Sequence, residues 1–331
     1  MVIRIISFLT FLFIFSACNG HSSSAHLTAE PIRIHRFDKA LFQLIESDDT
    51  ILRQPLLQEY PHMLDITGKA ILNMQSPDQS GFFARLENYY SEPTLKKLYA
   101  EAIRLYDSVE DIEQELGNGF AYMQASFPDR QLPEIYMHVS GLNQNVLAGE
   151  DLLSISIDKY MGKEYPLYQD FFYENQRQKM QKSYIVPDYL SGWLMTEFPF
   201  EGNESVLLDR MVYEGKIKYL VPNALPQITP YDLLGYTKEE YDWCVENSKA
   251  IWKSIIERKH LYTPDIMVTT KYFEDTPSPS MIFPDAPGNL GIWIGWQIII
   301  HYMKESGNSP ERLMQLQDAQ EILTVSKYKG H

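Results

Sequence analysis

The chain has 331 residues and carries a net charge of −15 at neutral pH. A chain this acidic is a poor partner for nucleic acid or for an anionic lipid surface, so no nucleic-acid partner is predicted. The length is enough to bury the core of one large domain, and there is no second long apolar span and no internal repeat. We therefore predict a single globular domain over residues 31–331.

The N-terminus predicts a signal peptide over residues 1–17. Arg4 precedes a largely apolar run over residues 5–15, which is shorter than the roughly 20 residues of a membrane-spanning helix. The segment that follows, Phe15-Ser-Ala-Cys, resembles a bacterial lipobox, in which small residues precede a lipidated cysteine. This resemblance implies that Cys18 carries lipid and becomes the first residue. The alternative is an ordinary signal peptide with an incidental cysteine.

Small polar residues follow Cys18 and predict a flexible, lipid-anchored tether over residues 18–30. The tether would attach the domain to a membrane of the cell envelope. With Cys18 lipidated, Cys244 is the only other cysteine, which excludes an internal disulfide and a cysteine-based metal site.

Residues 31–130 are predicted to be mainly helical. Residues 51–90 have helical spacing with proline breaks, and the strongest periodic run of apolar residues covers 93–116. We expect Gly117 and Gly119 to interrupt that helix before it continues.

Residues 131–331 are predicted to combine a small sheet with more helices. Residues 135–139 and 153–158 alternate apolar and polar side chains and are joined by residues 141–149, which predicts an antiparallel pair. A proline-rich loop is expected over 259–289, and loops of this length are often functional. The predicted class is α+β, predominantly α-helical, with a small antiparallel sheet packed against helices. Helices are predicted over 170–182, 187–198, 204–220, 238–258, 290–305 and 310–324.

The helix over 204–220 contains the main candidate for a functional carboxylate. Its apolar residues Leu207, Met211 and Val221 share one face with Glu214. A carboxylate on an apolar face must be paired, coordinated or protonated. The alternative is an ordinary ion pair of Glu214 with Lys218 or with Arg210 on a half-exposed helix. Gly215 is expected to let another backbone approach closely.

Several catalytic patterns are missing from the chain. No two of the eight histidines are four residues apart, so no helical turn offers zinc two imidazoles. There is no nucleophile elbow, no Walker loop and no dinucleotide fingerprint, and no cofactor or metal is predicted. Gly291 and Gly295 are interpreted as positions of close helix packing. The aromatic residues of the C-terminal half suggest either core packing, which we favour, or a groove for a glycan or peptide.

Several stretches, in order along nearly the whole chain after Cys18, resemble the GldB gliding-motility lipoproteins of Bacteroidota. This resemblance implies an envelope lipoprotein needed for gliding and associated with the type IX secretion apparatus, and relatives also occur in non-gliding species. The stretches are Arg36-Phe-Asp-Lys, Ser140-Gly-Leu-Asn, Asp158-Lys-Tyr-Met-Gly, Met211-Val-Tyr-Glu-Gly-Lys-Ile, Leu234-Gly-Tyr-Thr, Trp243-Cys, Pro287-Gly-Asn-Leu-Gly-Ile-Trp-Ile-Gly-Trp-Gln-Ile and Ile322-Leu-Thr-Val-Ser-Lys-Tyr-Lys.

The order of elements over residues 131–331 is also similar to a family of zinc peptidases, which have His-Glu-x-x-His on one helix and a glutamate ligand on the next. By this resemblance Glu214 stands at the third ligand position. The first helix offers Asp188 and Tyr189 but no histidine. The resemblance therefore implies a zincin-like scaffold with a vestigial site at Glu214, Asp188 and Tyr189, no catalytic residue and no bound metal.

Three functions follow from these patterns. The first is a non-catalytic envelope protein that assists gliding or secretion machinery through contacts with other envelope proteins. The second is a hydrolase or peptidase-like enzyme that uses Glu214. The third is a nutrient-capture lipoprotein that binds a ligand with its C-terminal aromatic residues.

Overall fold

A computed structural model describes residues 29–47, 49–74, 76–275 and 286–331. The predicted signal peptide, Cys18 and most of the predicted tether lie outside the described residues. Within the described ranges, no helix is both long enough and apolar enough to cross a membrane.

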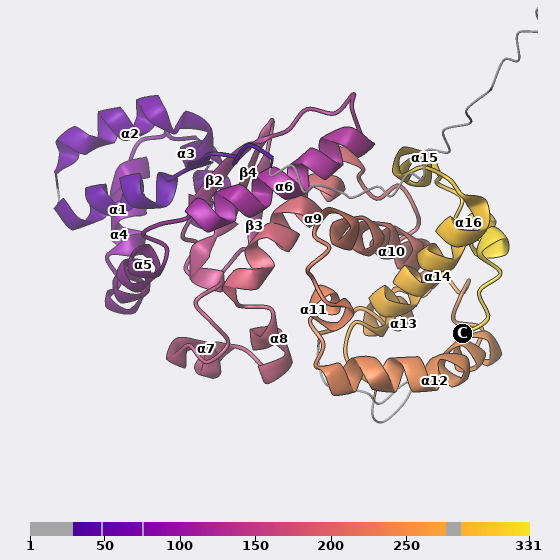
Figure 1. The fold of residues 1–331 in the computed structure, drawn as a ribbon. Helices are drawn as coiled ribbons and strands as arrows, with labels where there is room; N and C mark the ends of the chain where they lie inside the picture. The colour runs from indigo at the N-terminus through magenta and orange to yellow at the C-terminus, as the bar shows by residue number, and fades with distance from the viewer. Residues whose placement is uncertain (1–28, 48, 75, 276–285) are drawn as a thin grey trace, which may run out of the picture.

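The described chain is mainly helical around a small central sheet, which confirms the predicted α+β class. Figure 1 shows α1–α5 at one end of the molecule and α10, α12, α14 and α16 at the other. The strands are β1 (Ile34–His35), β2 (Glu134–His138), β3 (Val146–Gly149) and β4 (Leu152–Ser156). The helices are α1 (Phe37–Ser47), α2 (Arg53–Glu59), α3 (Pro61–Thr67), α4 (Phe82–Tyr90), α5 (Pro93–Leu105), α6 (Glu110–Ser126), α7 (Pro166–Phe171), α8 (Glu174–Gln178), α9 (Ile185–Glu197), α10 (Leu207–Ala224), α11 (Pro230–Leu234), α12 (Lys238–Glu257), α13 (Ile266–Lys271), α14 (Leu290–Ser306), α15 (Pro310–Gln315) and α16 (Ala319–Ser326).

The sheet has the strand order β1-β2-β4-β3, and its pairing corrects the prediction. The two predicted strands, β2 and β4, run parallel, with Ile135 opposite Leu153. The antiparallel partner of β4 is instead β3, which lies in the segment expected to be a connection. Because β3 turns back into β4 through Glu150 and Asp151, the chain reaches β4 in the same direction as β2.

The helix predicted over 93–116 is two helices, and the expected interruption at the glycines was wrong. The break falls between α5 and α6, where Tyr106 leaves the helical conformation. Helix α6 runs through Gly117 and Gly119 without a break. These glycines instead allow close packing, since a Cβ atom at Gly117 would lie 2.2 Å from the carbonyl oxygen of Glu30, and one at Gly119 would lie 2.9 Å from Leu190.

Helices α10 and α14 cross at two glycines, as the sequence predicted for Gly215 and Gly295. A Cβ atom at Gly215 would lie 2.3 Å from the Gly295 carbonyl, and one at Gly295 would lie 1.8 Å from the Met211 carbonyl oxygen. Backbone contact this close is possible only where both helices lack side chains. The predicted helix over 310–324 is divided into α15 and α16, because Asp318 caps a new helix by accepting hydrogen bonds from two amides.

Buried apolar residues form one hydrophobic cluster that reaches from Ile34 in β1 to Tyr328 near the C-terminus. Trp293 and Trp296 belong to it, with 1% and 7% of their surface exposed. These two tryptophans are therefore core residues, as favoured from their spacing, and do not line a binding groove.

Candidate functional site

Asp188 lies in the first turn of α9, where its carboxylate accepts a hydrogen bond of 2.6 Å from the Tyr160 hydroxyl. Burial raises the pKa of the Asp188 carboxyl, while the Tyr160 hydrogen bond and the charges of Lys218 and Lys179 partly offset that rise. The carboxylate is therefore already engaged by a donor from another part of the chain.

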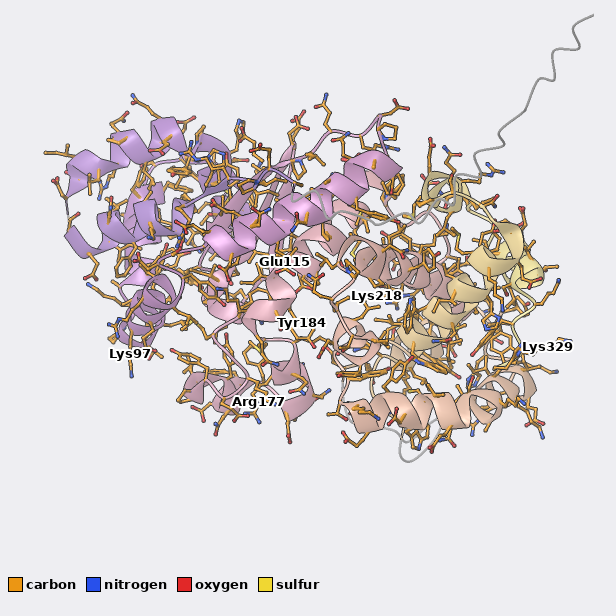
Figure 2. The ribbon with its side chains drawn as sticks, in the orientation of Figure 1. Lys97, Glu115, Arg177, Tyr184, Lys218 and Lys329 are labelled. Atoms are coloured by element: carbon orange, nitrogen blue, oxygen red, sulfur yellow. The ribbon has the colours of Figure 1, made fainter. Side chains whose placement is uncertain are left out.

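Lys218 on α10 connects this carboxylate to Glu214 electrostatically. Burial lowers the pKa of the Lys218 ammonium, whereas the charges of Asp188, Glu214 and Asp275 raise it. Figure 2 shows Lys218 in the middle of the molecule, where α9, α10 and α11 lie. A desolvated ammonium needs carboxylates nearby, and Asp188 on α9 and Glu214 on α10 supply them.

An ion pair between Lys179 and Asp275 borders the same region. The Lys179 ammonium lies 2.9 Å from a carboxylate oxygen of Asp275, which also accepts a hydrogen bond from the Asn289 side chain. The stem of Lys179 passes over Gly235, where a Cβ atom would lie 2.2 Å from the lysine chain. Gly235 also has a φ of +72°, so both space and backbone conformation favour glycine here.

Glu214 itself lines a pocket of about 380 Å³ between α10 and α13. Burial raises the pKa of its carboxyl, and the charges of Lys218, Arg210 and Lys179 lower it again in part. The side chain is half-buried, so it is closely surrounded but still reached from the pocket. The lining residues are Phe200, Glu204, Arg210, Tyr213, Glu214, Ile266 and Thr270.

Another buried carboxylate, Asp158, holds the loop that follows β2. One of its oxygens accepts a hydrogen bond of 3.0 Å from the Ser140 amide, and the other accepts one of 2.7 Å from the Leu142 amide. The Ser156 hydroxyl donates to the same carboxylate. Leu142 has a φ of +66°, which is uncommon for leucine, so these bonds fix an otherwise unfavourable loop conformation.

The whole chain resembles one protein family. Residues 21–330 match the model of the family described as gliding motility protein GldB. The chain belongs to the GldB family. Comparison with curated proteins and with solved structures gave no match. The name of the family points to gliding motility and to a lipoprotein, whereas Cys18 lies outside the matched residues and its lipidation stays a prediction.

The structure of this GldB-family chain brings two of the three predicted site residues together and separates the third. Asp188 and Glu214 both act on Lys218. Tyr189 points the other way, into the sheet, where its hydroxyl donates to the backbone carbonyl of Tyr136. Sequence reasoning included Lys218 only as an ordinary partner of Glu214, and it missed the Tyr160 contact because no spacing signal links residues so far apart in the chain.

The described residues around Asp188 and Glu214 do not form the zinc site that the similar peptidases carry. Within the described ranges, no group of three or more histidine, cysteine, aspartate or glutamate side chains could hold a metal ion. The buried cation Lys218 acts on both carboxylates in that region. The zincin-like scaffold stays a prediction.

Proposed function

We propose that this GldB-family member is a non-catalytic, lipid-anchored protein of the cell envelope that assists or assembles gliding or secretion machinery, or that does the equivalent in a non-gliding species. The observation that carries the proposal is the extent of the family match, which covers residues 21–330. A match of this extent involves the whole domain and not one shared motif.

The polar residues around Asp188 and Asp275 support a role in binding other proteins. Hydrolysis requires a nucleophile with its base, or a metal that activates water. Here Asp188 is engaged by Tyr160, and Asp275 is paired with Lys179. These contacts join α9 to Tyr160 and join the segment after α8 to the segment after α13. The protein would then act through its surface while the lipid holds it at the membrane.

The test uses a gliding host that encodes this protein. Deletion of the gene should abolish gliding and reduce secretion, and the wild-type gene should restore both. Replacement of the lipidation site, Cys18→Ser, should leave the protein in the soluble fraction and fail to restore gliding, whereas Cys244→Ser, a change at the other cysteine, should keep the membrane location. A deletion strain that glides and secretes normally would contradict the proposal.

A hydrolase remains the second candidate, and the pocket around Glu214 is the observation that favours it, since an enclosed carboxyl with a raised pKa can act as a general acid. Metal analysis of the purified protein and an activity screen with Glu214→Ala distinguish the two. Stoichiometric zinc, or turnover that the substitution abolishes, would favour the enzyme. The nutrient-capture alternative requires surface exposure, which protease treatment of whole cells measures.

A further inference from the structure

The pocket that contains Glu214 is lined by charged, aromatic and aliphatic residues. Glu214 lines it from α10 and is half-buried, whereas Glu204, Ile266 and Thr270 are exposed. A volume of about 380 Å³ is in the range that holds a small ligand or one long side chain.

The Glu214 carboxylate has no hydrogen-bond donor among the described residues, although it is closely surrounded. A buried carboxylate loses hydration, and it regains that free energy only from donors or cations. Asp158 shows the usual solution in this same chain, with backbone amides bound to both of its oxygens. The Glu214 carboxylate receives no such hydrogen bonds from the described residues, and its accessible surface faces the pocket.

Two other polar groups of the pocket have contacts within the chain. The Tyr213 hydroxyl donates a hydrogen bond of 3.0 Å to the Phe198 carbonyl. The Arg210 guanidinium lines the pocket and lies over the Phe273 ring, 4.2 Å from its centre. Glu204 and Glu214 are the two carboxylates among the lining residues and supply the charged acceptors for a ligand.

We propose that this pocket binds a cationic group, an alkylammonium or a guanidinium carried on a short apolar stem. The cation would pair with Glu214, and the more exposed Glu204 would also attract it. The stem would lie against Phe200 and Ile266. This inference goes beyond the proposed function and does not depend on it.

Aromatic faces beside the carboxylates support a cationic ligand over a neutral one. The rings of Phe200 and Tyr213 lie 5.1 Å apart at 53° to each other, so the wall presents aromatic surface. A cation over such a face is attracted by about 0.5–2 kcal/mol, depending on how far it is desolvated. An apolar or anionic ligand would gain nothing from Glu214 and would leave its carboxylate unpaired.

The positive charges near Glu214 belong to Lys218, Arg210 and Lys179. They partly offset the rise that burial causes in the pKa of Glu214, and two of them have other contacts, Lys179 with Asp275 and Arg210 with Phe273. Their charge weakens the binding of a further cation without removing it, so we expect a weak site that favours a ligand with a single positive charge at its tip.

The experiment titrates the full mature protein in detergent with three probes and follows binding by calorimetry. The probes are acetyl-Gly-Lys-Gly-amide, the same peptide with norleucine in place of lysine, and 1,5-diaminopentane. We expect the lysine peptide to bind roughly tenfold or more tightly than the norleucine peptide, because only lysine supplies a charge-assisted bond. Tighter binding of the lysine peptide indicates a protein side chain as the ligand, and tighter binding of the diamine indicates a free amine.

Glu214→Gln should weaken the lysine peptide roughly tenfold, because a neutral amide loses the charge-assisted bond. Glu201→Gln, at an exposed position just outside the pocket, should leave its binding unchanged. Circular dichroism checks folding, and if Glu214→Gln unfolds, Glu204→Gln gives the second test with an expected loss of about threefold. Equal binding of the lysine and norleucine peptides, or unchanged binding in both pocket variants, would overturn the inference. Neither result would affect the gliding test.

Discussion

The loop after β2 and the pocket on α10 each contain a carboxylate that loses hydration through burial. The two carboxylates differ in the partners that compensate for this loss. Asp158 is bound by the amides of Ser140 and Leu142 and by the Ser156 hydroxyl. Among the described residues, Glu214 is influenced by the charges of Lys218, Arg210 and Lys179 without a hydrogen bond, and it lines an open pocket. Burial raises the pKa of both carboxyl groups, so the difference lies in their partners.

This difference separates a structural carboxylate from one that is available to a ligand. Asp158 fixes a loop that contains two consecutive left-handed residues, Gly141 and Leu142, and its hydrogen bonds are complete within the chain. Glu214 stabilises no such element. Replacing Asp158 should therefore unfold a region of the protein, whereas replacing Glu214 should change binding more than folding.

The largest effect is expected from Asp158→Ala. The substitution removes the acceptor of the Leu142 amide, the acceptor of the Ser156 hydroxyl and one of the two acceptors of the Ser140 amide, so we expect a loss of about 4 kcal/mol in the free energy of unfolding. Asp158→Asn keeps one acceptor oxygen and should lose about half as much. Urea denaturation followed by circular dichroism measures both, and a loss below about 1 kcal/mol for the alanine variant would remove the structural role of Asp158.

The second largest loss of stability is expected at the contact between α10 and α14. Gly295→Ala would place a Cβ atom 1.8 Å from the Met211 carbonyl oxygen and force α10 and α14 apart, at a cost of about 3 kcal/mol. Gly192→Ala is the matched control, because the nearest atom there is a flexible side-chain carbon of Val146 at 3.2 Å. Its effect should stay within about 1 kcal/mol. Similar losses in both variants would show that the helix contact is not special.

Lys216 extends the comparison to a buried cation. Burial lowers the pKa of its ammonium to about 8 from the usual 10.5, and the ammonium donates to the Leu316 carbonyl. Between these two pH values the unfolded chain binds more protons than the folded chain, so stability rises with pH. Compared with Lys216→Met, the wild type should gain about 2 kcal/mol between pH 8 and pH 10.5. Parallel pH profiles of the two proteins would contradict this.

The smallest change in stability is expected from Glu214→Gln. A carboxyl whose pKa is raised on folding contributes stability below its unfolded value of 4.5 and loses it as the pH rises. The glutamine variant should therefore match the wild type in acid and equal or exceed it by up to about 1 kcal/mol at pH 7. Thermal unfolding across this pH range measures the difference, and a variant much less stable at neutral pH would make Glu214 structural, like Asp158.

The sequence predicted the features that depend on local spacing. Apolar residues three and four apart placed Glu214 on α10, and the glycine beside it indicated the contact with α14. The contacts of Asp158 and Asp188 come from residues whose approach depends on the tertiary fold. Strand β3 was missed because its four residues, Val146–Gly149, are too short to show a clear alternation.

The point where the chain enters the domain is fixed by Ala29, whose amide and carbonyl are bound by Asn118 and Gln114 on α6. If Cys18 carries lipid, as predicted, the chain from Cys18 to Ala29 can span about 40 Å at most, because a fully extended residue spans about 3.6 Å. Such a short connection would keep the domain close to the bilayer surface, where its effective concentration toward proteins of the same membrane is high. A modest affinity would then be enough for lasting association.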